Sequence, residues 1–151
     1  MVNLIESERC IRIVVADDNT QVREKVVQLL LPDCEVVGTH ANGQAALEAV
    51  LQLNPDIALL DISMPLMSGI EVAHELRTRS SRTKIVFLTV HEDVDFVSAA
   101  FDAGASAYVI KSQMASDLHA AISAVERGGV FVSPMCAVNG NLSNGRLNDA
   151  A

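Results

Sequence analysis

The strongest constraint on the fold of this sequence is the alternation of short, β-branched apolar runs with longer segments of helical periodicity. Four runs are apolar almost throughout and a fifth is weaker; the predicted strands are 11–16, 35–39, 57–60, 84–89 and 107–110. Runs that lack a polar residue at every second position are typical of strands buried on both faces. The alternation therefore predicts a parallel sheet covered by helices on both sides.

The segments between these runs have the apolar spacing of amphipathic helices. The first segment, for example, places Val22, Val26 and Leu29 on one helix face. Strand and helix alternate five times, and parallel strands need right-handed crossovers between them. We therefore predict a doubly wound, five-stranded α/β domain.

The predicted helix starts carry matching capping residues. Asn19 or Thr20 can cap the first helix, and Asn42 can cap the second. Ser68 and Glu71 have the spacing of a capping box at the start of the third. Local sequence and hydrophobic periodicity thus predict the same helix boundaries.

The length of the chain, 151 residues, fits one domain with short extensions. We assign 1–9 to an N-terminal arm and 10–134 to the domain. Residues 135–151 form a C-terminal tail whose Asn, Gly and Ser content is typical of linkers.

Charge and composition exclude several classes of function. Lys and Arg total 11 and Asp and Glu total 19, a net charge of −8, which argues against binding of nucleic acid or an anionic membrane by these residues alone. No apolar stretch approaches the roughly 20 residues of a membrane helix. With no Trp and one Tyr, there is little aromatic surface for stacking a base or a flavin. We expect a cytoplasmic protein.

Three cysteines, Cys10, Cys34 and Cys136, match neither a zinc-site spacing nor a disulfide scaffold. We expect them to be small buried or half-buried hydrophobic residues in a reducing compartment.

Polar side chains follow the predicted strands at their carboxyl ends. They are Asp17 and Asp18 after the first strand, Asp61 after the third, Thr89 at the end of the fourth and Lys111 after the fifth. In a parallel sheet these ends share one edge, where ligands bind. Strands one and three are expected to be neighbours, so the three aspartates should converge. A divalent cation relieves the repulsion among three carboxylates, and an all-oxygen cluster suits Mg²⁺.

The same edge has the groups needed to bind and transfer a phosphoryl group. The formal charges of the three aspartates, a divalent cation and Lys111 sum to zero, so an incoming phosphoryl group meets no net repulsion. An aspartate can act as the nucleophile and form an aspartyl phosphate, with a metal and a lysine on the phosphoryl oxygens. Each residue alone has a structural explanation, such as helix capping or dipole compensation. Their occurrence together at one edge favours a phosphoryl-transfer site.

These residues lie in motifs that resemble the receiver domain of bacterial two-component response regulators. The motifs are Val-Val-Ala-Asp-Asp at 14–18, Asp-Ile-Ser-Met-Pro at 61–65, Phe-Leu-Thr at 87–89 and Ala-Tyr-Val-Ile-Lys at 107–111. The resemblance covers about residues 10–133, and Glu-Arg-Gly-Gly-Val-Phe-Val-Ser-Pro at 126–134 is similar to the NarL/FixJ subgroup. It implies a flavodoxin-like sheet with strand order 2-1-3-4-5.

The resemblance also implies a role for each acidic residue. Asp61 would accept the phosphoryl group from a sensor histidine kinase. Asp18 and Asp61 would coordinate Mg²⁺ directly, with the backbone carbonyl of Ser63 as third protein ligand, and Asp17 would act mainly through a bound water.

Three further residues would respond to the phosphoryl group. Lys111 would pair with its oxygens and Thr89 would hydrogen-bond one of them. Tyr108 would be an aromatic switch that turns inward when Thr89 moves toward the phosphate, a two-state element biased by phosphoryl contacts.

Two positions depart from common receiver patterns. Ser112 follows Lys111 where many receivers have a proline with a cis bond, and because a non-proline cis bond costs about 2.5–4 kcal/mol, we expect a trans bond here. Val90 follows Thr89 where smaller residues are common, so we expect slow loading by small phosphodonors. His91, two residues past Thr89, could influence hydrolysis.

Other functions fit less well. A haloacid-dehalogenase-type phosphatase needs a second aspartate at the position of Ser63, and a flavodoxin-type carrier needs aromatic residues around its flavin. No Gly-x-x-x-x-Gly-Lys motif for nucleotides occurs. We therefore expect a signalling switch that phosphorylates and dephosphorylates itself rather than a turnover enzyme.

The expected partners follow from the resemblance. A histidine kinase would dock near the first helix, and a second copy of the chain or an output domain would read the phosphorylated state. Regulators of this subgroup usually continue into a helix-turn-helix domain. The chain is thus either a receiver cut from a longer protein or a stand-alone receiver.

Overall fold

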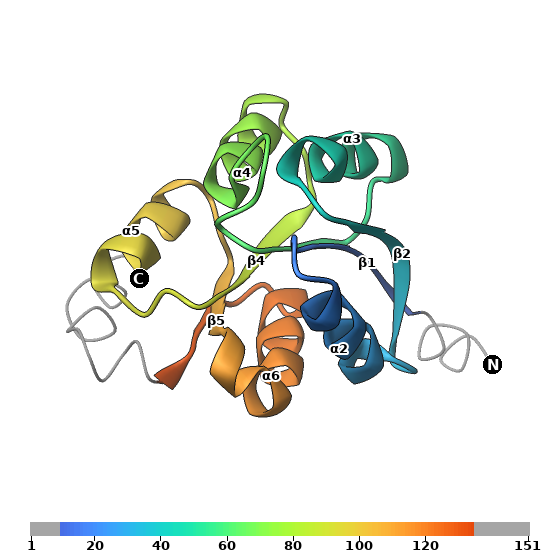
Figure 1. Ribbon diagram of the computed structural model, residues 1–151, viewed down its shortest axis with the longest axis vertical. Coiled ribbons are helices and arrows are strands. Elements are labelled where there is room, and N and C mark those ends of the chain that lie inside the picture. Colours follow the sequence, from blue (N-terminus) through green and yellow to red (C-terminus); the bar gives the residue numbers. More distant parts are fainter. Residues whose placement is uncertain (1–9, 135–151) are drawn as a thin grey trace.

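The computed structural model describes residues 10–134, which form a central sheet between two layers of helices (Figure 1). The predicted arm, 1–9, and the predicted tail, 135–151, with Cys136, lie outside the described residues. The strands are β1 (Ile11–Ala16), β2 (Cys34–His40), β3 (Ile57–Leu60), β4 (Lys84–Thr89), β5 (Ala107–Ile110) and β6 (Phe131–Val132). The helices are α2 (Thr20–Leu30), α3 (Gly43–Leu53), α4 (Gly69–Thr78), α5 (Val94–Asp102) and α6 (Met114–Glu126), with a short 3₁₀ turn, η1 (Lys111–Gln113), before α6.

All strands are parallel, and their order is β2-β1-β3-β4-β5-β6. The predicted order of the first five strands is confirmed. The structure adds β6, which pairs with β5 through Phe131 and Val132. Two residues are too short a run to show any periodicity, so hydrophobic patterning alone could not predict this strand.

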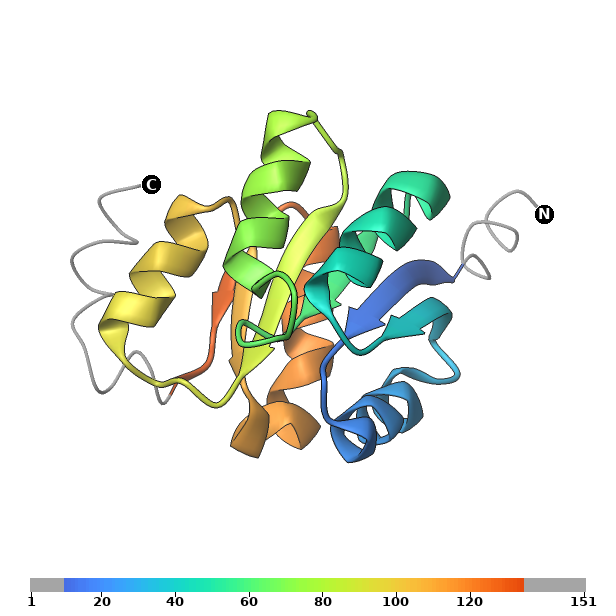
Figure 2. The ribbon, with the colours of Figure 1, turned by 45° about the horizontal axis from the view of Figure 1, so that its top comes forward.

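Each central strand divides its side chains between two hydrophobic cores. In β1, Ile13 and Val15 face α2 and α6, whereas Val14 and Ala16 face α3, α4 and α5. The other central strands alternate in the same way. Figure 2 shows the two helix layers on opposite sides of the sheet. Burial on both faces explains why these strands are apolar throughout.

The helix starts are capped as predicted. Asn19, and not Thr20, caps α2 by accepting a hydrogen bond from Val22 N at 3.1 Å. Asn42 caps α3 in the same way. At α4, Ser68 and Glu71 form the reciprocal pair of a capping box.

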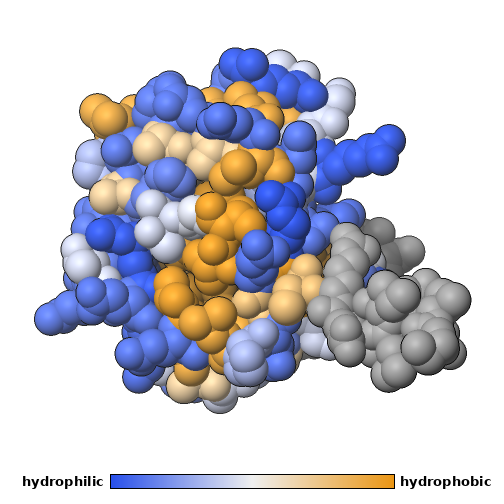
Figure 3. Space-filling view, turned by 90° about the vertical axis from the view of Figure 1, so that its right-hand side faces the viewer, coloured by the Kyte–Doolittle hydropathy of each residue, from blue (hydrophilic) through white to orange (hydrophobic). Residues whose placement is uncertain are grey.

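The side of the molecule where β2 forms the sheet edge has an apolar strip between more polar surroundings (Figure 3). β2 contributes Val36 and Val37, which are partly buried against the two cores.

Cys34, the first residue of β2, is buried, and burial, with the nearby charge of Asp33, raises the pKa of its thiol to about 11. Cys10 is half-buried, so both described cysteines have the expected environment. No helix within 10–134 is long and apolar enough to span a membrane.

The packed core predicts a sharp contrast between two leucines. Leu60 is fully buried in β3, whereas Leu66, in the next loop, is 80% exposed. Leu60→Ala removes buried methyl groups and leaves a cavity, so it should lower the free energy of unfolding by about 2–5 kcal/mol. Leu66→Ala should change it by less than about 0.5 kcal/mol. Urea denaturation measures both, and equal effects would contradict the assigned core.

Candidate functional site

The register of the sheet brings two of the predicted aspartates side by side. Ala16 of β1 pairs with Leu60 of β3, so Asp17 and Asp61 are the next residues at the carboxyl edge. The backbone of each is held in the sheet, since Asp17 N donates to His40 O at 3.0 Å and Asp61 N donates to Ala16 O at 2.9 Å. The positions of both carboxylates therefore follow from strand pairing.

The three predicted acidic residues form one cluster. A carboxylate oxygen from each of Asp17, Asp18 and Asp61 lies within 4.8 Å of the others. Asp17 is 2% exposed and Asp61 is 6% exposed, whereas Asp18 is exposed to solvent. Two carboxylates are thus held away from water beside a third.

Lys111 reaches into this cluster from the end of β5. Its Nζ lies 2.7 Å from Asp17 Oδ2 and 3.0 Å from Asp61 Oδ2. Burial alone would lower the pKa of this ammonium group, but its hydrogen bonds and charge interactions with the two aspartates outweigh burial, so that the pKa of Lys111 is raised. Lys111 therefore remains charged and bridges the two buried carboxylates.

The pKa of the Asp61 carboxyl is raised even though Lys111 lies beside it. Burial raises the pKa of its carboxyl above the usual range, and the charge of Asp17 raises it further. The hydrogen bond from Lys111 lowers the pKa of Asp61 but only in part. The ionised form of Asp61 is thus disfavoured mainly by burial, and repulsion from Asp17 adds to this effect.

The donor set fits a divalent cation. Asp17 Oδ2 is buried, and the ammonium group of Lys111, 2.7 Å away, is the cation paired with it. The cluster offers only carboxylate oxygens, and the exposed Asp18 leaves one side open to water. Oxygen ligands with space for water are typical of Mg²⁺ sites.

The loop after Asp61 is fixed by close backbone packing at Gly69, the first residue of α4. Gly69 N donates to Ile62 O at 2.8 Å, and a Cβ at position 69 would lie 2.2 Å from the carbonyl oxygen of Asp61. That distance is far below van der Waals contact, so only glycine fits here. Gly69 has no role predicted from the sequence, because nothing in the sequence shows that another part of the backbone approaches it.

Thr89, the last residue of β4, and Tyr108, in β5, are both fully buried. Thr89 pairs in register with Ile110, the residue before Lys111. Its Oγ1 accepts a hydrogen bond from His91 N at 3.3 Å, and Tyr108 donates its hydroxyl hydrogen to His91 O at 2.7 Å. The described contacts therefore join Thr89 and Tyr108 to each other through the backbone of His91.

The side chain of His91 extends this group to the loop after Asp61. Its Nε2 lies 3.2 Å from Ser63 Oγ. The ring stacks on Phe96, with centroids 4.0 Å apart and planes inclined by 8°. His91 thus contacts three predicted site residues, Ser63, Thr89 and Tyr108.

Arg23 is a second residue without a predicted role. Its Nη1 donates to Asp17 O at 2.6 Å and its Nη2 to Thr20 Oγ1 at 3.2 Å, which ties α2 to the loop that carries Asp17 and Asp18. An arginine in the first turns of a helix is common, so the sequence gives no signal for this contact.

The bond between Lys111 and Ser112 is trans, as expected.

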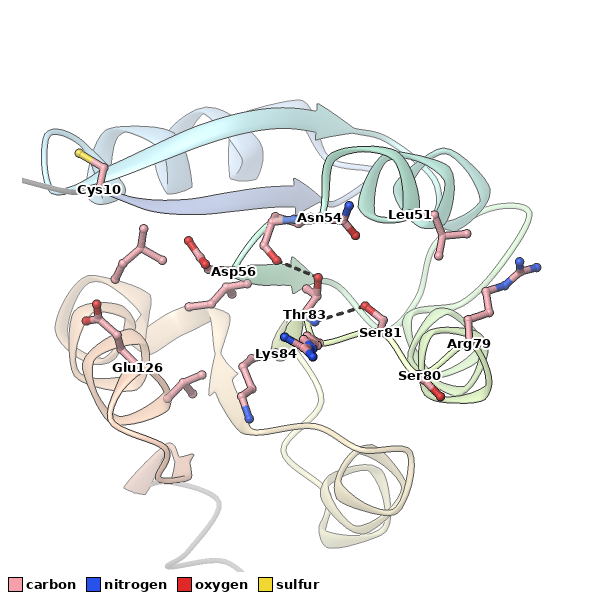
Figure 4. A pocket seen from close by; sticks show the side chains of 15 residues that line it. Cys10, Leu51, Asn54, Asp56, Arg79, Ser80, Ser81, Thr83, Lys84 and Glu126 are labelled. Carbon is pink, nitrogen blue, oxygen red and sulfur yellow. Dashed lines mark hydrogen bonds between the residues drawn. The ribbon is translucent and has the colours of Figure 1, made fainter. Parts of the chain in front are cut away.

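Cavities lie at both the carboxyl and the amino ends of the strands. A cleft of about 580 Å³ beside the cluster is lined by Asp18, Ser63 and Phe96 among others. A larger cavity, of about 800 Å³, lies at the amino ends of β1, β3 and β4 and is shown in Figure 4. None of the predicted site residues lines it. Cavity size therefore does not identify the site, whereas the converging charged groups do.

A family model described as the response regulator receiver domain matches residues 13–123. The chain belongs to this family. It is a receiver domain of two-component response regulators, and the fold and the acidic cluster at its carboxyl edge agree with that assignment.

Several curated proteins are similar to this receiver domain. The transcriptional regulatory protein DegU of Brevibacillus brevis is 36% identical over 135 residues, which cover 88% of this chain and 57% of that protein. The nitrate/nitrite response regulator protein NarL of Escherichia coli K12 is 35% identical over 123 residues, 80% of this chain and 57% of that protein. The chain thus spans little more than half the length of these relatives.

An enzyme is also among the relatives. A protein-glutamate methylesterase/protein-glutamine glutaminase of a Nocardioides species is 43% identical over 105 residues, but the match covers only 29% of that protein.

Solved structures have the same fold. A two-component response regulator of the LuxR family from Aurantimonas sp. SI85-9A1 superposes with a TM-score of 0.80 at 34% identity, over 85% of this chain and 94% of that one. A signal receiver domain from Mycobacterium tuberculosis superposes with a TM-score of 0.76 at 33% identity, over 80% of this chain and 98% of that one. The flavodoxin-like fold predicted from the sequence is confirmed.

The raised pKa of Asp61 predicts a stabilising substitution. A carboxyl whose pKa is raised by folding holds its proton more tightly in the folded state, so the ionised form lowers stability increasingly as pH rises from the ordinary carboxyl range through the raised pKa. Without divalent cations, Asp61→Asn should therefore raise the melting temperature at pH 7, and the gain over wild type should shrink toward pH 4.

Differential scanning calorimetry across this pH range measures the effect. Glu24→Gln, which neutralises an exposed carboxylate in the middle of α2, is the matched control and should leave the melting temperature nearly unchanged. A lower melting temperature for Asp61→Asn than for wild type at pH 7 would show that Lys111 compensates the cluster fully.

Proposed function

We propose that Asp61 is the phosphoacceptor of this receiver domain and that a sensor histidine kinase supplies the phosphoryl group. The observation that supports this most strongly is that Asp61 Oδ2 lies 3.0 Å from the Lys111 ammonium while a carboxylate oxygen of Asp61 lies within 4.8 Å of those of Asp17 and Asp18. A nucleophilic carboxylate, a fixed cation and an acidic metal site are the groups that phosphoryl transfer to aspartate requires.

Mg²⁺ is the cation that we assign to the acidic cluster. Asp18 and Asp61 would coordinate it directly, with the backbone carbonyl of Ser63, and Asp17 mainly through water. When bound, the ion neutralises negative charge on the carboxylates and the phosphoryl oxygens. This assignment is supported by the all-oxygen donor set and by the negative charge that Lys111 leaves uncompensated.

The chain's own residues then act in a balanced transfer. A carboxylate oxygen of Asp61 forms a bond to phosphorus as the bond between phosphorus and the imidazole nitrogen of the donor histidine breaks, and the imidazole leaves. The ammonium group of Lys111 pairs with the phosphoryl oxygens. Hydrolysis later returns Asp61 to its free carboxylate, and His91, which lies on the loop beside Ser63, would influence the rate at which water attacks.

The switch uses the residues that meet at His91. In this structure the Thr89 hydroxyl accepts a hydrogen bond from His91 N, and the hydroxyl of the inward-facing Tyr108 donates to His91 O. A Thr89 hydroxyl that donates to a phosphoryl oxygen would move toward Asp61 and change its contact with His91. Tyr108 is already buried and turned inward here, the position that we expected to accompany phosphorylation. Phosphorylation would then increase the population of this arrangement over one with Tyr108 turned outward.

The partners are assigned on the same basis. The histidine kinase would dock beside α2, whose start is tied to the acidic loop by Arg23. A second copy of the chain or an output domain would read the switch. Two relatives are named as regulators and extend well beyond the matched region, so an output domain that regulates transcription is the output that we propose.

Labelling with a phosphodonor tests the proposed phosphoacceptor. With Mg²⁺ and phosphoramidate, the wild type should gain one base-labile phosphoryl group, and Asp61→Asn should gain none because its amide cannot act as the nucleophile. Intact-mass spectrometry measures the gain. Asp95→Asn, which changes an exposed acid in the first turn of α5, is the control and should label like wild type. Equal labelling of Asp61→Asn would place the phosphoacceptor elsewhere.

The size of Val90 leads to a second expectation. Val90 is 64% exposed directly after Thr89, where it can narrow the approach to the phosphoryl group. Val90→Ala should accept phosphate from acetyl phosphate several-fold faster than wild type, whereas the exposed Val94→Ala should not. Initial labelling rates decide this, and unchanged rates for Val90→Ala would mean that position 90 does not control access.

A further inference from the structure

Lys111 must be held accurately to bridge two carboxylates, and the pairing of β5 with β4 ends at Ile110, the residue before it. It follows the four-residue strand β5 directly and opens η1, and neither η1 nor α6 has a side-chain cap at its start. The next residue is Ser112, so no proline ring restricts the backbone there. The main-chain support on the outer side of β5 also ends early, since β6 pairs only with Ala107 and Tyr108.

Ser133, the residue after β6, supplies the missing support. Its backbone N donates to Tyr108 O at 2.9 Å, and its hydroxyl oxygen accepts a hydrogen bond from Ile110 N at 3.0 Å. The side chain thus takes the place of the next main-chain acceptor in the ladder. Ser133 is fully buried, so water does not compete for the Ile110 amide.

Asp117, in the first turns of α6, sets the direction of this hydroxyl. Ser133 Oγ donates to Asp117 Oδ2 at 2.9 Å, which leaves a lone pair of Oγ directed at Ile110 N. Ser133 therefore ties together the two ends of the segment from Ile110 to Asp117. Lys111 lies within this segment and directly follows Ile110, whose amide is hydrogen-bonded to Ser133.

We propose that Ser133 and Asp117 are positioning residues for Lys111: they fix the backbone before Lys111 so that its ammonium group meets the phosphoryl group on Asp61. This inference rests on the proposed phosphoacceptor function. It also assigns a role to β6, which carries Ser133 to the edge of β5. We call the hydrogen bonds of Ser133 with Ile110 and Asp117 the clamp. Removing the clamp should slow phosphorylation, because a small misplacement of the Lys111 ammonium group costs roughly 10- to 100-fold in rate.

The test compares Ser133→Ala, Asp117→Ala and Asp117→Asn with the wild type. Ser133→Ala and Asp117→Ala should slow labelling of Asp61 by phosphoramidate roughly 10- to 100-fold. Asp117→Asn keeps an acceptor oxygen and should label at nearly the wild-type rate. Ser123→Ala, which removes a hydroxyl farther along α6 that bonds only the exposed Arg127, is the control for general effects on the helix. Asp117→Asn and Ser123→Ala should also keep the wild-type Mg²⁺ affinity, measured by calorimetry, because neither is expected to move Lys111.

A double substitution separates positioning from general damage. In a Lys111→Ala background, Ser133→Ala should slow labelling no further, because the clamp acts through Lys111. Hydrogen exchange at the Ile110 amide confirms that the clamp is lost. The proposal is overturned if the Ile110 amide loses protection while Ser133→Ala labels at the wild-type rate. It is also overturned if Ser133→Ala slows labelling as much in the Lys111→Ala background as in the wild type. If Ser133→Ala fails to fold, Asp117→Ala against Asp117→Asn gives the same decision. Wild type that does not label at all would instead contradict the phosphoacceptor assignment.

Discussion

Repulsion among three carboxylates at one edge of the sheet is the interaction on which the rest of this structure depends. Asp17 and Asp61 are buried side by side, Asp18 is next to them, and the ammonium group of Lys111 offsets only part of the charge. Burial and the charge of Asp17 both raise the pKa of the Asp61 carboxyl, so its ionised form is disfavoured in the isolated domain. The arrangement also creates a place where a divalent cation and a phosphoryl group can bind without rearrangement of the sheet.

The sheet holds this unfavourable cluster because its own packing is favourable. Side chains of the central strands are buried alternately in two cores, so the strands cannot slip in register without exposing them. Asp17 and Asp61 continue the ladder by one hydrogen bond each beyond Ala16 and Leu60. The close approach of Gly69 to the Asp61 carbonyl then fixes the following loop. Strand pairing, rather than attraction between the site residues, brings the charges together.

Much of this arrangement could be predicted from the sequence. Apolar runs, helical spacing and capping residues are local signals, and they placed the five main strands and the caps at Asn42 and Ser68. Residues at the ends of parallel strands converge for topological reasons alone, so the acidic cluster and Lys111 could also be predicted. Thr89 could be placed at that edge in the same way. The family resemblance named Tyr108 and Ser63, which carry little signal of their own.

Other features depend on contacts that no local pattern encodes. The two-residue strand β6 pairs with β5, and Ser133 after it bonds both β5 and α6, all distant in the sequence. The contacts of His91 with Ser63, Thr89 and Tyr108 need the positions of three separate segments. The raised pKa of Asp61 likewise depends on how deeply the carboxyl is buried. These details follow from tertiary packing and required the structure.

The most direct test of the central idea is a titration of the ¹⁵N-labelled domain with Mn²⁺, a paramagnetic ion that takes oxygen ligands as Mg²⁺ does. The account predicts that substoichiometric Mn²⁺ broadens the amide signals of Asp17, Asp18, Asp61 and their neighbours first, and that excess Mg²⁺ restores them. Broadening spread evenly over the exposed acidic residues, with no preference for the carboxyl edge of β1 and β3, would contradict it.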